Sequence, residues 1–332
     1  MHRPQPILNA STNLLPLTGA PWISKVDTAL QNAAGFLGKT RYAALISTPA
    51  LVGMYYNKAD FAKAGIKTLP KSIPDMIADA KTLKAAGITP FYDAAKDQWP
   101  TQWFVQSELA DAAKAGFYQK LNDRKAQWTD ATFTDAVTEY QSLIKQGLFN
   151  SDIKTGTFVG QGTALLNGSA AMTDQITAFS TELLSDAGSA SALDSKIGYF
   201  GISPTGNLSL AIPDQTNGLV AFKTGNAKRE AAAKQLIEYW MGDGYKTFVD
   251  SQSSVSIEPS VSTPSTVPAL FKQIAAGYQN SVPGLQPQVI ATPDIHIYLS
   301  NMIQGTMTVQ QVAQSMQTQF NQLAKAEGAK GF

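Results

Sequence analysis

The sequence predicts an α/β protein with about two domains. Short apolar segments of strand length alternate with helical patterns along the chain, which is typical of α/β folds. The chain has 332 residues, and a soft prior of ~150 residues per domain gives about two domains. Apolar residues make up 44% of it, which is enough for a sizeable core and too many for a disordered chain.

Four segments carry the start and stop signals of helices. Their predicted first turns lie, in order, at Pro74-Asp75, Thr129 or Asp130, Asn226, and Thr308. Glycines 87 and 147 end the first two helices, and Thr308 with Gln311 forms a capping box for the fourth. The third helix, over 227–241, is expected to turn Leu236, Ile237 and Trp240 inward.

Strand-length apolar segments lie between these helices. They are residues 88–92, 170–173, 197–200 and 219–222. The uncharged run 42–56 predicts a strand, a turn and a second strand. Residues 201–215 and the Ser- and Pro-rich segment 251–266 are predicted as linkers or hinges.

Composition and motifs favour a binding protein over an enzyme. Lys and Arg number 26 against 25 Asp and Glu, so the net charge is +1, whereas a nucleic-acid partner would need a basic excess. The chain has no cysteine and two histidines, His2 and His296, so no metal site and no thiol chemistry are expected. It has no nucleotide-binding glycine motif and no nucleophile elbow, so no cofactor is expected. Arg3 is not followed by an apolar segment, so a secretory signal is not predicted.

Several longer motifs then occur in a fixed order. They are YYNKADFAKAGI (55–66), GITPFYDAAKDQWP (87–100), FVGQGTALLNGSAAM (158–172), NGLVAFKTGNAKREAAAKQLIEYWM (217–241) and QGTMTVQQVAQSMQTQF (304–320). Their order resembles that of the extracellular solute-binding proteins of family 1. These are the carbohydrate-binding receptors of ABC importers and relatives of maltose-binding protein.

The resemblance implies a two-lobe fold of the periplasmic-binding-protein type II, with three crossings between the lobes. The first lobe would comprise residues 1–48 and 217–253, the second 53–202 and 261–332, and the crossings 49–52, 203–216 and 254–260. Similar proteins carry a longer segment before Gly38, with a signal peptide and the first strands of the first lobe. The first lobe is therefore expected to be incomplete here.

A sugar site needs aromatic platforms and convergent polar groups. The cluster Asp97, Trp99 and Trp103 has this composition and follows a predicted strand, where ligands of α/β proteins bind. The alternative is that Trp99 and Trp103, four residues apart, form one helix face that packs inward.

Asp174 and Gln175 end the next strand and could bind sugar hydroxyls. The alternative for Asp174 is a helix cap. In similar proteins a Gly-x-Trp segment follows this strand and its Trp stacks on the sugar, but residues 176–178 are Ile-Thr-Ala here.

Gln215 and Asn217 precede the strand at the second crossing, which faces the ligand in similar proteins. Turn formation by Asn217 and Gly218 is the alternative. Tyr42 is a further candidate, with core packing as its alternative. Arginine is scarce, which argues for a neutral ligand because bidentate arginines suit anions; Arg41 leaves an anionic ligand open.

The sequence and the resemblance together predict an extracytoplasmic, monomeric receptor. It would close by a hinge around a neutral mono- or oligosaccharide and dock on an ABC permease. One alternative is a carbohydrate-active enzyme with two carboxylates among Asp97, Asp174 and Glu258. Another is a truncated receptor fragment without function.

Overall fold

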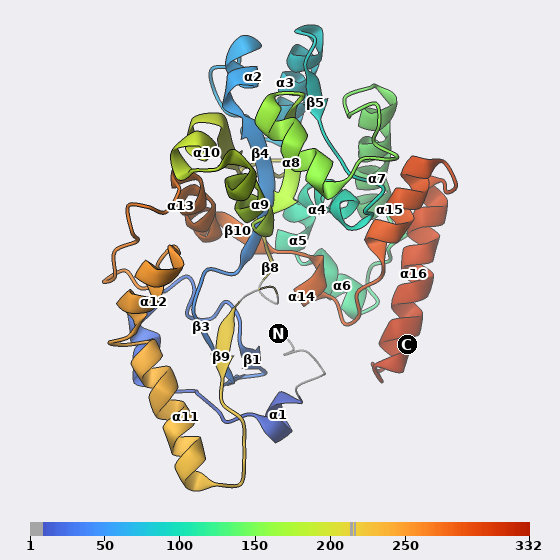
Figure 1. Ribbon diagram of the computed structural model, residues 1–332. Helices are drawn as coiled ribbons and strands as arrows, with labels where there is room; N and C mark the ends of the chain where they lie inside the picture. The colour runs from blue at the N-terminus through green and yellow to red at the C-terminus, as the bar shows by residue number, and fades with distance from the viewer. Residues whose placement is uncertain (1–8, 213–214, 216) are drawn as a thin grey trace.

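The computed structural model describes residues 9–212, 215 and 217–332. Figure 1 shows a small and a large lobe, and buried apolar side chains form separate cores in the two lobes. The core of the small lobe draws on residues 15–45 and 221–257. The core clusters of the large lobe draw on residues 51–212 and 270–320. The chain therefore passes between the lobes three times, and the predicted two-lobe α/β fold is confirmed.

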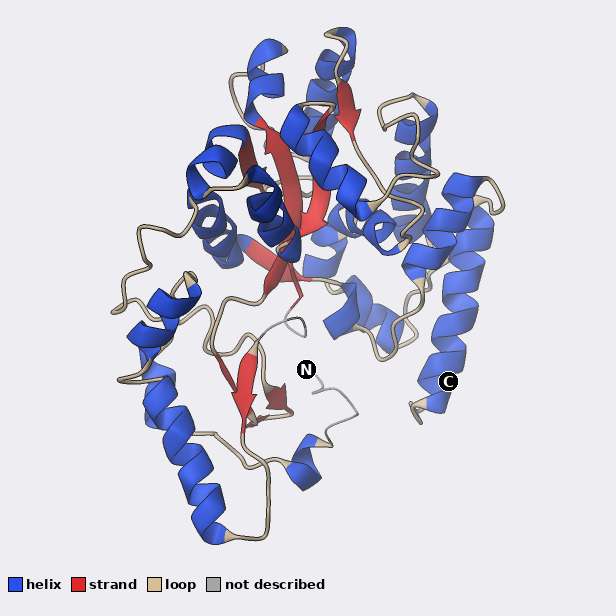
Figure 2. Cartoon of the chain, viewed as in Figure 1, coloured by secondary structure: helices blue, strands red, loops and turns tan. Residues whose placement is uncertain are grey.

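The large lobe is built on a six-stranded mixed sheet (Figure 2). Its strands are, across the sheet, β10 (Ser281–Pro283), β8 (Ser209–Ile212), β4 (Ala50–Asn57), β6 (Ala170–Ile176) and β5 (Thr89–Phe91), with β7 (Ile197–Phe200) also paired to β4. The central strand β4 is antiparallel to β6, β7 and β8. Strand β5 runs parallel to β6, and β10 runs parallel to β8.

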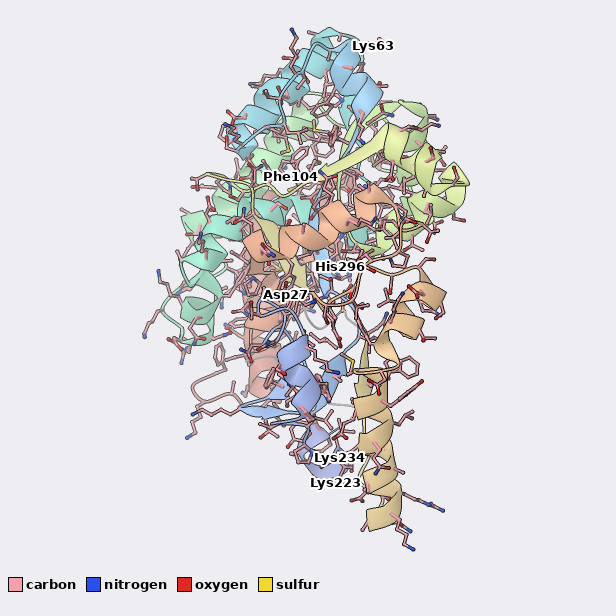
Figure 3. The ribbon with its side chains drawn as sticks, turned by 90° about the vertical axis from the view of Figure 1, so that its left-hand side faces the viewer. Asp27, Lys63, Phe104, Lys223, Lys234 and His296 are labelled. Carbon is pink, nitrogen blue, oxygen red and sulfur yellow. The ribbon has the colours of Figure 1, made fainter. Side chains whose placement is uncertain are left out.

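Helices cover both faces of this sheet, and strand alternation decides which side chains each face receives. Leu51 and Tyr55 of β4 belong to the core cluster on one face, whereas Met54 belongs to the cluster on the other. The helices that contribute to the first cluster are α8 (Phe158–Asn167), α9 (Ala178–Ala187), α10 (Ala190–Lys196) and α13 (Ala269–Ala276). Those that contribute to the second include α3 (Ile73–Ala85), α4 (Gln102–Glu108), α6 (Phe117–Asn122), α7 (Ala131–Lys145), α15 (Ile295–Gln304) and α16 (Val309–Ala326). Figure 3 shows Phe104 of α4 inside this lobe.

Shorter helices complete the large lobe. They are α2 (Lys58–Lys63), η3 (Trp99–Thr101), α5 (Ala110–Lys114), η4 (Gly277–Asn280) and α14 (Leu285–Gln288). None of the helices in the described part of the chain is long and apolar enough to cross a membrane.

The small lobe contains two short two-stranded sheets and its own helices. Its elements are α1 (Ala10–Asn13), η2 (Pro21–Lys25), β1 (Phe36–Leu37), β2 (Thr40–Arg41), β3 (Ala43–Leu45), β9 (Gly218–Val220), α11 (Ala227–Trp240) and α12 (Tyr245–Gln252). Strands β1 and β2 pair antiparallel, as do β3 and β9. Figure 3 places Asp27 near the junction with the large lobe and Lys223 and Lys234 toward the far end of the small lobe.

The four predicted helices are confirmed as α3, α7, α11 and α16. Asn226 accepts hydrogen bonds from the backbone N–H groups of two residues in the first turn of α11, and Thr308 and Gln311 form the expected capping box of α16. One detail is wrong: Leu236 is 59% exposed. Helix α11 buries only Ile237 fully, because it lies along the outside of the small lobe and contacts that lobe through a narrow strip of its surface.

The predicted linker 201–215 differs from the structure, because it contains strand β8 of the large sheet. Ser209–Ile212 are buried and pair with both β4 and β10. The surrounding Gly, Pro and Asn residues hid this four-residue strand from a reading of local composition. Within the predicted second crossing, residues 213, 214 and 216 lie outside the described residues, as do residues 1–8. The predicted lobe boundaries stay a prediction.

Candidate functional site

Two of the three connections between the lobes run side by side. Strands β3 and β9 pair in the small lobe, and β4 and β8 pair in the large lobe. Between them, the Ile46 N–H donates to the Asn217 carbonyl at 3.2 Å, and the Ala50 N–H donates to the Gln215 carbonyl at 3.1 Å. An antiparallel ribbon therefore links the two sheets and restricts how the lobes can move relative to each other.

The third connection follows α12 and is fixed to the first by one buried side chain. The Tyr245 hydroxyl donates to the Ile46 carbonyl at 3.2 Å and accepts from the Ile257 N–H at 3.0 Å. Tyr245 itself belongs to the core of the small lobe. The backbone segments that leave the small lobe are thus held together at their origin.

A cavity of about 730 Å³ lies at this junction, within the range of ~300–1,000 Å³ that small-molecule sites occupy. All three connections line it, through residues 47–49, Gln215 with Asn217, and residues 253–255, and the adjoining ends of β4 and α12 add Ala50, Leu51 and Gln252. The large lobe adds residues 176–178, where β6 ends and α9 begins, and further side chains of α9 and α13. None of the described lining residues is charged.

Gln215 and Asn217 are the predicted site residues that line this cavity. Both are exposed, and their backbone carbonyls are engaged by the first connection. Their amide side chains can therefore face a ligand while the backbone stays in the ribbon. Tyr42 lies in the small lobe, where it is half-buried, and is absent from the described lining.

The two predicted tryptophans lie at the large-lobe side of the junction, outside the described lining of the cavity. Trp103 is 2% exposed and belongs to a cluster with Val52 and Ile176. Ile176 also lines the cavity, so Trp103 lies behind its wall. Trp99 is half-buried, and its ring centroid lies 5.0 Å from that of Phe158.

Asp97, Asp174 and Gln175 are held by protein partners. Asp97 accepts from the Phe158 N–H at 2.6 Å, at the start of α8. The Gln175 side chain is fully buried, donating to Gln161 at 3.0 Å and accepting from the N–H of the residue that follows it. Asp174 is 8% exposed, and its Oδ2 accepts from Ser107 at 2.7 Å.

The second oxygen of Asp174, Oδ1, is buried and has no hydrogen-bond partner among the described residues. Burial therefore raises the pKa of Asp174 to about 7, and the nearby Asp93 carboxylate adds to the increase. Burial likewise raises the pKa of Asp93 to about 6. The structure thus places Asp174 inside the large lobe rather than on the surface of the cavity.

The three carboxylates of the enzyme alternative occupy different surroundings. Asp97 holds the start of α8, and Asp174 lies in the large-lobe interior. Glu258 belongs to the third connection and is buried. None of the three is among the described lining of the cavity. General acid–base hydrolysis needs two carboxyl groups that flank one bond, and these three carboxylates do not meet in this arrangement at the described lining of the cavity.

The sequence reading missed the side chains that α9 and α13 contribute. Thr177, Thr181 and Phe271 line the cavity. Residues 176–178, which stand where similar proteins have Gly-x-Trp, also line the cavity. No local pattern distinguished Phe271 from the core residues of its helix, because its position depends on a contact between segments far apart in the chain.

Residues 14–247 match the family model described as bacterial extracellular solute-binding protein. This match covers more than half of the chain, and the chain belongs to that family. The resemblance found in the sequence is thereby confirmed. The family is defined by solute binding and not by catalysis.

Individual relatives are more distant. An ABC transporter extracellular-binding protein from Pyrococcus horikoshii is 27% identical over 133 residues, covering 40% of this chain and 30% of that protein. The chain thus matches less than a third of that relative's length. RafE from Streptococcus pneumoniae has a TM-score of 0.77 at 18% identity, covering 96% of this chain and 81% of its own. A chitin oligosaccharide binding protein has a TM-score of 0.73 at 20% identity, covering 94% and 79%. RafE has also been solved in complex with raffinose.

Proposed function

We propose that the protein is the substrate-binding receptor of an ABC importer and that it binds a neutral mono- or oligosaccharide between its lobes. The observation that carries this proposal is the cavity of about 730 Å³ at the junction, which all three connections line. A ligand held there touches both lobes. It would therefore bind a closed arrangement better than an open one and favour closure.

The chemistry of the lining supports a neutral ligand. The lining carries hydroxyl and amide groups beside apolar side chains, and no described lining residue is charged. Arg41, the arginine that kept an anionic ligand open, is buried in the small lobe with its guanidinium 4.3 Å from the centroid of Phe36. It donates to the backbone carbonyls of Gln31 and Ala43, so it is not available to a ligand in the cavity.

Among the predicted site residues, we assign direct contact to Gln215 and Asn217. Trp99 is outside the described lining but packs against the cluster that contains the lining residue Ile176, and we propose it as an apolar platform at the edge of the site. Trp103, Asp174 and Gln175 are buried. They would act from behind the cavity wall by holding Ile176 in position. Contacts by Asp97 and Tyr42 stay predictions.

The carbohydrate class is supported by the solved relatives, whose names refer to raffinose and to chitin oligosaccharide. The transporter partner is supported by the name of the Pyrococcus relative. An extracytoplasmic location is supported by the family description. A monomeric receptor with no nucleic-acid partner is part of the same proposal.

Binding of a defined panel tests this function. Calorimetry would compare raffinose, maltose, lactose and chitobiose with the charged sugars glucuronate and glucosamine. We expect at least one neutral sugar to bind without being hydrolysed. We expect the charged sugars to bind with lower affinity. Asn217→Ala should weaken that binding about three- to tenfold, which is the range for one lost hydrogen bond. Asn321→Ala, at an exposed position of α16, is the matched control.

Hydrolysis of a bound sugar would instead support the enzyme alternative, and failure of every neutral sugar to bind would contradict the proposal.

A further inference from the structure

The two walls of the junction cavity differ in chemistry. The wall formed by the connections and the end of α12, here called the polar wall, carries hydroxyl and amide side chains. Its polar members are Ser47, Thr48, Gln215, Asn217, Gln252, Ser253 and Ser254. The opposite wall, here called the apolar wall, belongs to the large lobe. Its main members are Leu51, Ile176, Leu184, Pro268, Phe271 and Ile274.

Two of the hydroxyls on the large-lobe side are already used within the protein. The Thr177 Oγ1 donates to the Leu51 carbonyl at 3.0 Å and accepts from the Leu51 N–H at 2.8 Å. The Ser180 hydroxyl donates to the Thr177 carbonyl at 2.6 Å, and its side chain is buried. Neither hydroxyl can donate to a ligand without losing a bond. Thr181 and Thr266 also line this side and are exposed, so the accessible apolar surface lies mainly at Leu184 and Phe271.

Phe271 is the aromatic residue among the described lining of the cavity. It is half-buried and packs against the large-lobe core beside Leu184. The start of its helix is fixed, because the Asp194 carboxylate accepts from the N–H groups of Ala269 at 2.8 Å and Leu270 at 2.9 Å. The ring therefore stands on a rigid element, and a ligand that uses it need not order the wall first.

A bare saccharide would leave part of the apolar wall without a suitable partner, although one C–H face of a sugar ring can lie on Phe271. Hydroxyls pressed against leucine, isoleucine and phenylalanine side chains would lose water without gaining partners, which costs free energy for each group. An apolar substituent placed there would instead gain from leaving water. The ligand that fits both walls has a polar half and an apolar half.

We propose that the ligand is a glycoside with an apolar aglycone. Its sugar would face the polar wall, and its aglycone would lie against Phe271 and Leu184. This inference rests on the proposed function, since it assumes that the junction cavity is the sugar site. It adds the chemical class of the ligand, its orientation and Phe271 as a residue that determines specificity.

The test compares methyl and 4-nitrophenyl glycosides of the same sugar by calorimetry, using both anomers of D-glucose and D-galactose. We expect a 4-nitrophenyl glycoside to bind about tenfold more tightly than its methyl counterpart, as one added aromatic contact allows. In Phe271→Ala this advantage should shrink to about twofold or less, while the methyl glycoside keeps its affinity. Phe271→Leu should retain part of the advantage, and it guards against misfolding of the alanine variant. Phe222→Ala is the matched control, because Phe222 is 50% exposed and absent from the described lining.

The outcomes separate this inference from the proposed function. If neutral sugars bind and the two glycosides have equal affinity, the apolar-aglycone inference is overturned and the receptor function stands. If Phe271→Ala weakens both glycosides equally, the ring does not read the aglycone, and the inference is again overturned. If no saccharide or glycoside binds, the proposed function fails, and this inference fails with it.

Discussion

Asp174 shows how a residue's chemistry depends on what surrounds it. Its place at the end of a strand suggested either a sugar contact or a helix cap. In the structure it is buried, with Ser107 bound to one oxygen and the other without a described partner. Helix α9 has Thr177 at its N-cap position, not Asp174. Asp174 instead lies near the buried Asp93, whose carboxylate adds to the effect of burial in raising the pKa of Asp174.

The burial of Asp174 predicts that the free energy of unfolding depends on pH. Asp174→Asn should reduce this pH dependence. The pKa of Asp174 is about 7 when folded, against an ordinary value of about 4 in the unfolded chain. The folded state therefore binds this proton more tightly, and stability is lost as pH rises from about 4 to about 7. Each pKa unit corresponds to about 1.4 kcal/mol, so the loss is on the order of a few kcal/mol.

Urea unfolding at pH 4.5 and pH 8 measures this effect. The wild-type protein should lose more free energy of unfolding between these two pH values than Asp174→Asn does. Asp135→Asn removes a carboxylate from an exposed position of α7 and should leave the wild-type pH dependence unchanged. An Asp174→Asn variant with the full wild-type pH dependence would show that this carboxyl is already charged at neutral pH.

At the scale of elements, the junction is held by short segments more than by whole helices. Thr177 at the end of β6 binds both backbone groups of Leu51 through its hydroxyl, and its own N–H donates to the Leu51 carbonyl at 2.8 Å. Leu51 lies in β4 immediately after the first connection. This contact fixes the start of the central strand β4, from which the first connection leads to the small lobe.

Thr177→Ala should therefore destabilise the large lobe. The Leu51 N–H would lose its side-chain acceptor at a buried position, at a cost of about 1–3 kcal/mol. Thr177→Ser keeps the hydroxyl and should recover most of the loss, whereas Thr177→Val keeps the shape and should not. Denaturant unfolding measures all three. Equal stability of the serine and valine variants would show that the hydroxyl contributes nothing measurable.

The helices and strands differ in how much their local sequence reveals about them. The helices α3, α7, α11 and α16 could be predicted because their caps and periodic apolar positions are adjacent in sequence. Strand β8 could not, since four residues among glycine, proline and asparagine carry little local signal. It becomes a strand because β4 and β10 lie on its two sides.

At the scale of the whole molecule, the two cores are separate and the cavity lies between them. In this conformation Tyr278 of η4 packs against both the small-lobe core and a large-lobe cluster. A ligand that touches both lobes can shift the equilibrium toward the closed arrangement only by the difference between its affinities for the closed and the open arrangement. The paired ribbon of the first two connections should guide that movement as a hinge.

Small-angle scattering should therefore show a smaller radius of gyration with a bound neutral saccharide than without it. Asn217→Ala should reduce this compaction as well as the affinity, because Asn217 lies on the connection that the ligand must draw inward. A sugar that the protein does not bind provides the baseline. Tight binding with an unchanged radius of gyration would show that the ligand contacts one lobe alone, and the hinge-closing receptor would then be ruled out for this chain.

The sequence by itself determined the α/β class, the main helices, most strands, the absence of cysteine chemistry and the family resemblance. These depend on composition, on periodicity and on the order of motifs, all of which are local or additive along the chain. The tertiary structure decided which of the candidate residues meet. It brought Asn217 to the cavity, placed Trp103 behind the wall and Asp174 in the interior, and added Phe271 from a helix that sequence gave no reason to choose. A binding site is a set of distances between segments remote in the chain, and only the packed fold fixes those distances.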